Sequence, residues 1–358
     1  PEIHEPFIEG IQKSSWAAVS AAGGMGHRFL IFTQRSYGGG IPTLPYASVY
    51  PWLSSFSVRP IKYLLWLSNA IRIVREIRAR DVRGIVVFSL DWSFILPLML
   101  VRLLCPRIPV RIAIFSMRDA GLFQRIFFAA CGGNGVSYLV RSSFMRDRLI
   151  VCGIPPNRIE IFLSHLEGGV IPPPFSAIDS SLSRTVLYLS SADSGAGADA
   201  VLRAARAVPD CRFVLAVRDF GARGADAFSR LERRVMRENL PNVFLERNID
   251  VPAALFSAGA VVLPPRSEQD TMDMPLVLLE SFYARVPAVV SDNPVFSDMI
   301  RNGYVLPYRD AAGLSDAIRA ALDRGDSVIA MLDRAGRFAD ALPDASGAAR
   351  EYFFFGPI

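Results

Sequence analysis

Lysine, histidine and cysteine are scarce in this chain. Only two of the 39 basic residues are lysines, and there are three histidines and four cysteines. No two cysteines form a CxxC pair, which argues against a structural zinc site or a disulfide framework and favours a reducing compartment. The sequence also lacks a Ser–His–Asp arrangement, an HExxH motif, a Walker motif and a GxGxxG turn before a helix. These absences argue against hydrolase, zinc-protease, P-loop and nicotinamide-binding classes.

A long uncharged apolar run is also missing. The most apolar stretch, residues 84–105, contains Asp91, Pro97 and Arg102. A membrane-spanning helix needs about 20 largely uncharged residues. We therefore expect a buried strand at 84–90 followed by a helix that ends at Leu104.

The charge is unevenly distributed along the sequence. Residues 1–170 carry 19 basic and 10 acidic side chains, whereas residues 171–358 carry 20 and 24. A basic first half suits an anionic partner, such as a phosphate-bearing acceptor or a membrane surface, or it is simply a solvated face. No nucleic-acid-binding signature accompanies it, so nucleic acid is not expected as a partner.

Short apolar segments alternate with amphipathic ones, which predicts parallel sheets wrapped by helices. Expected strands are 28–33, 84–90, 110–116, 135–140, 157–164, 185–190, 212–217, 242–247, 260–265 and 287–292. Expected helices are 62–81, one that starts at 91 or 93 and ends at 104, 142–153, 197–209, 225–239, 250–259, 275–285 and 310–324.

A segment rich in Pro, Gly and Ser interrupts this pattern and predicts an interdomain linker. We expect a first domain at residues 1–170, a linker at 171–184 and a second domain at 185–335. Residues 336–358, with three consecutive Phe, are expected to return to the first domain. The chain starts without Met, and we expect the first strand of the first domain to precede Pro1.

Residues 267–300 carry the pattern with the clearest chemistry. A strand leads into an acidic loop and then a helix that begins near Pro275, whose N–H groups and dipole form a natural anion site. Glu280 lies on this otherwise apolar helix, where a carboxylate is costly unless it is paired or hydrogen-bonded. Either sugar hydroxyls or a salt bridge to an arginine would satisfy it, and both alternatives stay open.

The segment PLVLLESFYARVPAVVSD (275–292) resembles the donor-site signature of the family 4 retaining glycosyltransferases. The resemblance continues through 296–322, 242–268 and 142–162. It implies an α/β GT-B fold, with two Rossmann-like, doubly wound parallel-sheet domains facing across a cleft. It further implies a cytoplasmic hexosyltransferase that moves a hexose-type sugar, with retention, from a UDP- or GDP-linked donor to a glycan or lipid-linked acceptor. Neither a cofactor nor a metal is expected.

The same resemblance assigns roles to individual residues. Glu280 would hold the ribose hydroxyls, and Asn248 would border the base. Gly10 would let the first loop approach the phosphates. The family's Arg and Lys are absent from the loop at 190–199, so Arg218, which follows the next strand, becomes the candidate source of positive charge. The diphosphate and donor sugar would meet the backbone of Met274, Pro275, Leu276 and Val277.

The sequence departs from the family pattern at three places. Met272 stands where the family has its first Glu, so the neighbouring Asp273 becomes the candidate for gripping the donor sugar. The loop at 190–199 has no Arg or Lys, and the family's acceptor-side His is replaced by Arg118 and Asp119. We therefore take Asp273, Arg118 and Asp119 as candidate catalytic residues.

Two other functions stay open beside the transferase. The departures favour a non-catalytic, glycosyltransferase-like module that binds a glycan or a partner enzyme, and a sugar-nucleotide epimerase is the third alternative. Among the histidines, His27 is expected to be structural, whereas His4 and His165 could border the ligand site. Contact of the basic half with a membrane surface would make the protein membrane-peripheral.

Overall fold

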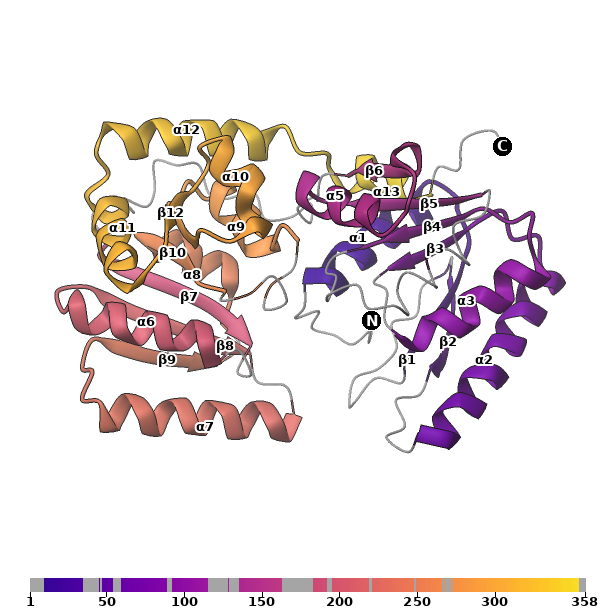
Figure 1. Cartoon of the computed structure of the whole chain (residues 1–358), viewed down its shortest axis with the longest axis horizontal. Helices are drawn as coiled ribbons and strands as arrows, with labels where there is room; N and C mark the ends of the chain where they lie inside the picture. Colours follow the sequence, from indigo (N-terminus) through magenta and orange to yellow (C-terminus); the bar gives the residue numbers. More distant parts are fainter. Residues whose placement is uncertain are drawn as a thin grey trace. The chain divides into compact units, whose positions relative to one another are not determined.

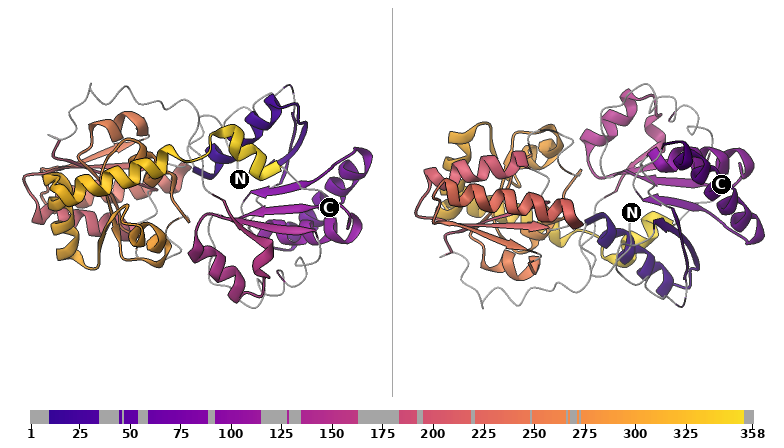
Figure 2. Two further views of the ribbon diagram at one scale, coloured as in Figure 1. Left: turned by 90° about the horizontal axis from the view of Figure 1, so that it is seen from above. Right: turned by 90° about the horizontal axis from the view of Figure 1, so that it is seen from below.

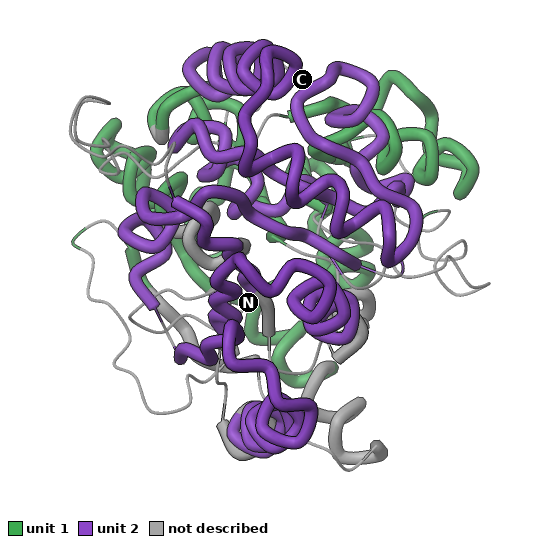
Figure 3. The backbone as a smooth tube through the Cα atoms, turned by 90° about the vertical axis from the view of Figure 1, so that its left-hand side faces the viewer, with its two compact units in different colours: residues 1–167, 343–358 green, residues 168–342 purple. Residues whose placement is uncertain are grey.

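The computed structural model divides the chain into two compact units (Figure 3). The first comprises Pro1–Glu167 and Pro343–Ile358, and the second comprises Gly168–Leu342. Most of the expected linker lies outside the part of the chain that the structure describes. The described residues are 10–34, 45, 47–53, 59–88, 92–114, 128, 135–162, 183–191, 195–218, 221–247, 249–265, 267, 271 and 273–353.

Six parallel strands form the sheet of the second unit (Figure 1). They lie side by side in the order β12-β11-β10-β7-β8-β9. If the strands are numbered 1 to 6 along the chain and read across the sheet from β9, their order is 3-2-1-4-5-6, which is the order of a doubly wound sheet. The strands are β7 Thr185–Ser191, β8 Arg212–Arg218, β9 Val243–Arg247, β10 Ala260–Leu263, β11 Ala288–Ser291 and β12 Leu306–Tyr308.

Helices lie on both sides of this sheet (Figure 2). The central strand β10 has the sequence AVVL and is buried at every position, as expected for a parallel strand covered on both faces. The helices are α6 Gly195–Ala207, α7 Gly221–Arg237, α8 Val251–Ser257, α9 Leu276–Tyr283, α10 Ser297–Arg301, α11 Ala311–Asp323 and α12 Asp326–Asp340. α12 continues through the expected domain boundary at residue 335.

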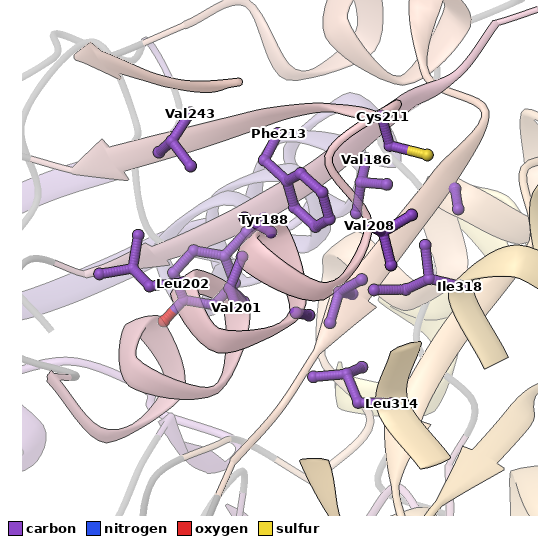
Figure 4. Packing of buried hydrophobic residues seen from close by; sticks show 14 of the residues in the cluster. Val186, Tyr188, Val201, Leu202, Val208, Cys211, Phe213, Val243, Leu314 and Ile318 are labelled. Atoms are coloured by element: carbon purple, nitrogen blue, oxygen red, sulfur yellow. The ribbon is translucent and has the colours of Figure 1, made fainter. Parts of the chain in front are cut away.

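Apolar side chains of α6 and α11 pack on one face of the sheet to form the core of the second unit (Figure 4). Leu314 and Ile318 lie four residues apart on α11, so they share one helix face, and both are fully buried. Asp310 caps α11 by accepting a hydrogen bond from the N–H of Gly313 at 2.8 Å. The apolar spacing and the cap together explain why this segment is helical.

The first unit contains a four-stranded parallel sheet in the order β3-β4-β5-β6 and a separate parallel pair, β1 and β2. Ser142 caps α5 by accepting from the N–H of Met145, and Gly153 has a φ of 93° just after this helix, which is a common way for a helix to end. The elements are α1 Gly10–Gly24, β1 Phe29–Gln34, β2 Ala47–Leu53, α2 Arg59–Ala79, β3 Ile85–Phe88, α3 Trp92–Leu104, β4 Val110–Ala113, β5 Val136–Val140, α5 Ser143–Val151, β6 Ile159–Ile161 and α13 Ala345–Phe353.

The last helix, α13, belongs to the first unit although it follows the second in sequence. Its Tyr352 is 1% exposed and packs against Phe88 and Phe162, with ring centroids 4.9 and 4.7 Å away. The ring of Phe353 packs against that of Phe29 in β1, with the ring centroids 4.8 Å apart. Aromatic side chains of α13 therefore complete the core of the first unit.

The most apolar stretch of the sequence folds as predicted, into strand β3 and helix α3. In the part of the chain that the structure describes, no helix combines the length and the apolar character needed to span a membrane.

Candidate functional site

The centre of the second unit's sheet contains a topological switch. β7 and β10 are neighbours, but the connection after β7 runs through α6 to β8 on one side, while that after β10 runs through α9 to β11 on the other. Open parallel sheets bind their ligands outside the carboxyl ends of the strands at such a switch point, which here are β7 and β10. The sheet order alone therefore selects the starts of α6 and α9 as a candidate site.

The start of α6 closely approaches both strands. A Cβ atom added to Gly197 would lie 2.7 Å from the phenol oxygen of Tyr188 on β7, and 3.5 Å from the carbonyl oxygen of Pro264, just after β10. Tyr188 is buried, so a side chain at position 197 would force its ring to shift within the core. The glycine lets the first turn of α6 lie against the ends of β7 and β10.

The loop after β10 is held at its start and strained at its end. Ser291 of β11 donates a hydrogen bond from its hydroxyl to the carbonyl oxygen of Pro265 at 2.9 Å. Met274, the second residue before α9, has a φ of 51° and is buried. A positive φ is unfavourable for a residue with a large side chain, and such strain is concentrated at functional sites.

Helix capping does not explain the conformation of Met274. The other non-glycine residues with positive φ in the described chain, Asn239, Arg285 and Arg324, each follow the end of a helix, where a left-handed residue is usual. Met274 instead precedes a helix. The surrounding loop therefore imposes its conformation, at the position where the chain enters α9.

α9 begins with an anion-binding geometry. Pro275 is the N-cap residue, and the N–H of Leu278 donates back to its carbonyl oxygen at 3.0 Å. The N–H groups of Leu276 and Val277 are in the first turn and have no acceptor within the helix. They point toward the positive end of the helix dipole, where a phosphate or carboxylate is stabilised.

Two carboxylates accompany this helix start. Asp273 is 1% exposed, and Glu280, on the second turn of α9, is partly buried. Ser281 and Phe282, beside Glu280, are fully buried, so α9 is firmly anchored in the unit. Burying a carboxylate is costly unless it has hydrogen-bonding or charged neighbours. Both Asp273 and Glu280 therefore require such neighbours.

The structure gathers some of the predicted site residues and leaves others apart. Asp273, Met274, Pro275, Leu276, Val277 and Glu280 lie together at the start of α9. Arg218 is the last residue of β8, in register with Ser191 of β7, and is thus at the same edge of the sheet. Asn248, Arg118 and Asp119 lie outside the described residues.

Gly10 is the first residue of helix α1, rather than part of a loop as the sequence suggested. The side chain of His27 is exposed. Its backbone N–H donates a hydrogen bond to the carbonyl oxygen of Ala22 in the turn after this helix.

Sequence reasoning missed two features of the site. The role of Gly197 depends on Tyr188 and Pro264, which are distant in sequence, although the glycines at 195 and 197 were a usable signal. The φ angle of Met274 had no signal, since methionine gives no hint of a left-handed conformation. Among the described residues, no group of three or more His, Cys, Asp or Glu side chains could hold a metal ion.

Comparison with known proteins gives a family match for the second unit only. Residues 183–324 match the family model described as Glycosyl transferases group 1. This region includes β7 to β12 and the start of α9. No curated protein matches the chain.

Solved structures resemble the whole chain at low sequence identity. Sucrose-phosphate synthase from Thermosynechococcus elongatus has a TM-score of 0.78 and 14% identity, over 98% of this chain and 94% of that one. Anabaena HepE in complex with UDP-glucose has a TM-score of 0.71 and 13% identity, over 98% and 96%. A glycosyltransferase from Rickettsia africae has a TM-score of 0.69 and 12% identity, over 97% and 94%. The chain thus has the predicted GT-B fold of two Rossmann-like domains, and part of its second unit resembles the Glycosyl transferases group 1 family.

Proposed function

We propose that this protein is a retaining hexosyltransferase. It takes a hexose-type sugar from a UDP- or GDP-linked donor and transfers it to a glycan or lipid-linked acceptor. The similar HepE structure was solved with UDP-glucose, which supports a nucleotide sugar as the donor. Sparse cysteine supports a reducing compartment such as the cytoplasm, and the basic first half supports a peripheral contact with a membrane.

The observation that carries this proposal is the strained entry into α9 at the switch point. Met274 is held at positive φ directly before a helix whose first N–H groups have no acceptor within the helix. These groups suit the diphosphate of the donor. Glu280 then lies on the second turn, where its two oxygens could accept hydrogen bonds from the ribose hydroxyls.

Stabilisation of the leaving group is the main chemical demand of this reaction. The bond between the anomeric carbon and the diphosphate oxygen breaks, and negative charge grows on the diphosphate. Preorganised N–H groups and the α9 dipole would stabilise that charge. The acceptor hydroxyl attacks from the same face of the sugar and gives its proton to the departing diphosphate oxygen, and the configuration is retained.

A donor panel tests the assignment of Glu280. Release of nucleoside diphosphate from UDP- and GDP-sugars should be measured for the wild type and for Glu280→Gln. A hydrogen bond to a charged group contributes about 1.5–3 kcal/mol, so kcat/KM should fall about tenfold or more, mainly through KM. Asp273→Asn, at the residue proposed to grip the donor sugar, should lower kcat instead.

The matched control is Glu232→Gln on the exposed face of α7, which makes the same chemical change away from the site. It should leave both constants unchanged. Full activity of Glu280→Gln would show that the ribose lies elsewhere, even if the protein is a transferase.

A second candidate function rests on the loop after β7. Residues 190–199 contain neither Arg nor Lys, so no side-chain cation of this stretch would meet a diphosphate. This favours a non-catalytic module that binds a glycan or a partner enzyme. Calorimetry with UDP and GDP separates the two functions, because the module should bind neither nucleotide.

A further inference from the structure

Helices α2 and α3 of the first unit expose an unusual number of apolar side chains. They pack against each other and are seen side by side in Figure 1. Leu103 is 74% exposed and Ile71 is 49% exposed. We name the α2–α3 face by its described apolar residues: Leu67 and Ile71 on α2, and Met99, Leu103 and Leu104 on α3.

These side chains are not needed to hold the helices in place. Val74 and Ile77 of α2 pack with Val101 and Cys105 of α3 in a buried cluster. On α3 this cluster lies opposite to Met99 and Leu103, and on α2 it adjoins the exposed stripe of Leu67 and Ile71. Leu67 and Ile71 are four residues apart, as are Met99 and Leu103, so each pair forms a stripe on one outer surface. Exposed contiguous apolar surface on a folded unit commonly marks a binding face.

The apolar stripes lie among arginines. Arg75 and Arg78 continue the stripe of Leu67 and Ile71 along α2, and the guanidinium of Arg78 donates to the carbonyl oxygen of Leu104 at 2.9 Å. That bond joins the C-terminal ends of the two helices. The α2 stripe therefore runs beside α3, and the two sets of apolar side chains belong to one surface.

The charge of this region has one sign. Residues 59–109 contain nine basic and three acidic side chains. Both described acidic residues already contact arginines: Glu76 with Arg80 at 3.1 Å and Asp81 with Arg83 at 3.9 Å. The exposed surface is therefore strongly positive as well as apolar.

We propose that the α2–α3 face docks on an anionic lipid bilayer. Leucine, isoleucine and methionine side chains can enter the boundary between headgroups and acyl chains, while neighbouring arginines reach the phosphates through their aliphatic stems. Charge complementarity favours an anionic bilayer, since each arginine near such a surface adds attraction. A neutral bilayer or a neutral protein surface would leave this charge unused.

This inference deepens the membrane contact of the proposed function but needs no nucleotide sugar. Docking through α2 and α3 would keep the protein at the surface where lipid-linked acceptors reside. The donor site belongs to the other unit, so the two properties can be lost separately.

Vesicle flotation tests the docking face. The full chain should float with phosphatidylcholine vesicles that contain phosphatidylglycerol, and much less with phosphatidylcholine alone. Ile71→Ser/Leu103→Ser should reduce the vesicle-bound fraction about tenfold, because the apolar contribution is lost. Arg75→Glu should cause a comparable loss that shrinks at high salt, since salt screens the attraction.

The controls repeat these changes on exposed residues of α7 in the second unit, as Met236→Ser and Arg233→Glu. Both should bind vesicles within about twofold of the wild type, and circular dichroism should show that every variant folds. Glu280→Gln should float normally even where nucleoside diphosphate release fails. Absence of flotation, equal flotation of the α2–α3 variants, or loss of a self-associated dimer in those variants would overturn the proposal.

Discussion

Arg234 of α7 lies between two carboxylates of the second unit. It contacts Asp199 of α6, and its Nε donates to Glu238 Oε1 at 2.7 Å. The hydrogen bond from Arg234 is the largest influence on Glu238 and lowers the pKa of its carboxyl, while partial burial opposes it. One guanidinium thus joins α6 to α7 beside the edge of the sheet.

Glu238 should make the free energy of unfolding depend on pH in the acidic range. Because its pKa is lower in the folded state, its contribution is present above the unfolded pKa of about 4.3 and is lost as the pH falls through the folded value. The unfolding midpoint of the wild type should therefore fall more steeply below that pH than the midpoint of Glu238→Gln. Denaturant titrations at several acidic pH values measure this.

The exposed Glu232 provides the control, because Glu232→Gln should keep the steep acid dependence of the wild type. Parallel curves for the wild type and Glu238→Gln would contradict this account of the Arg234 contact.

At the scale of single residues, the sequence suggested candidate site residues but gave no information on their conformation. Glu280 was recognisable because a carboxylate interrupts an apolar helix, and Pro275 because proline favours a helix start. The strain at Met274 and the contact of Gly197 with Tyr188 depend on tertiary packing. No local pattern encodes such contacts.

Elements were predicted best where burial gives them a continuous apolar run. Strands such as β4 and β10 are buried at every position, so their sequences stand out. β2 was missed because Pro51 interrupts it, and proline usually argues against a strand. α12 was missed because Gly336 weakens a helical pattern, although Val328, Met331 and Leu332 are buried on one face.

Two glycines test how elements of the second unit approach each other. A Cβ at Gly259, just before β10, would overlap the backbone carbonyl of Ser183, whereas one at Gly336 would overlap only the guanidinium of Arg285. The backbone at Gly259 and Ser183 is held in place by two hydrogen bonds. The N–H of Gly259 donates to the carbonyl oxygen of Thr185 at 2.8 Å, and the hydroxyl of Ser183 donates to the carbonyl oxygen of Ser257 at 2.6 Å. A flexible arginine can move.

We expect Gly259→Ala to lower the free energy of unfolding by about 3 kcal/mol, as overpacking does in a well-filled core. Gly336→Ala should change it by less than about 1 kcal/mol, because the gain in helix propensity offsets the ion pair of Arg285 with Asp340 at 2.7 Å. Urea unfolding measures both. Equal losses would show that Arg285 is as fixed as the backbone.

At the scale of the whole molecule, the duplicated pattern and the composition break around residue 170 predicted an α/β protein with two parallel-sheet units. The structure separates Pro1–Glu167 from Gly168–Leu342. The order of the strands in the sheet could not be predicted, because no local sequence pattern shows that β7 lies between β8 and β10. That order, which creates the switch point, became visible only with the fold.

Tyr352 tests the dependence of the first unit on its last helix. Tyr352→Ala should cost about 3–5 kcal/mol, since it removes a buried ring between Phe88 and Phe162. Hydrogen–deuterium exchange should accelerate in β4 and β5 and stay unchanged in β7 and β8. Tyr352→Phe, which keeps the ring, should show a much smaller effect, and equal acceleration in both units would contradict the division of the chain.

The position of α13 also has a consequence for biosynthesis. A ribosome translates residues 168–342 before it reaches α13, so the second unit is fully synthesised while the first still lacks a helix of its core. Domains usually mature in the order in which they emerge. Here the first unit cannot complete its core until α13 has been synthesised. Until then, the aromatic side chains around Phe88 lack the ring of Tyr352 that covers them in the folded unit.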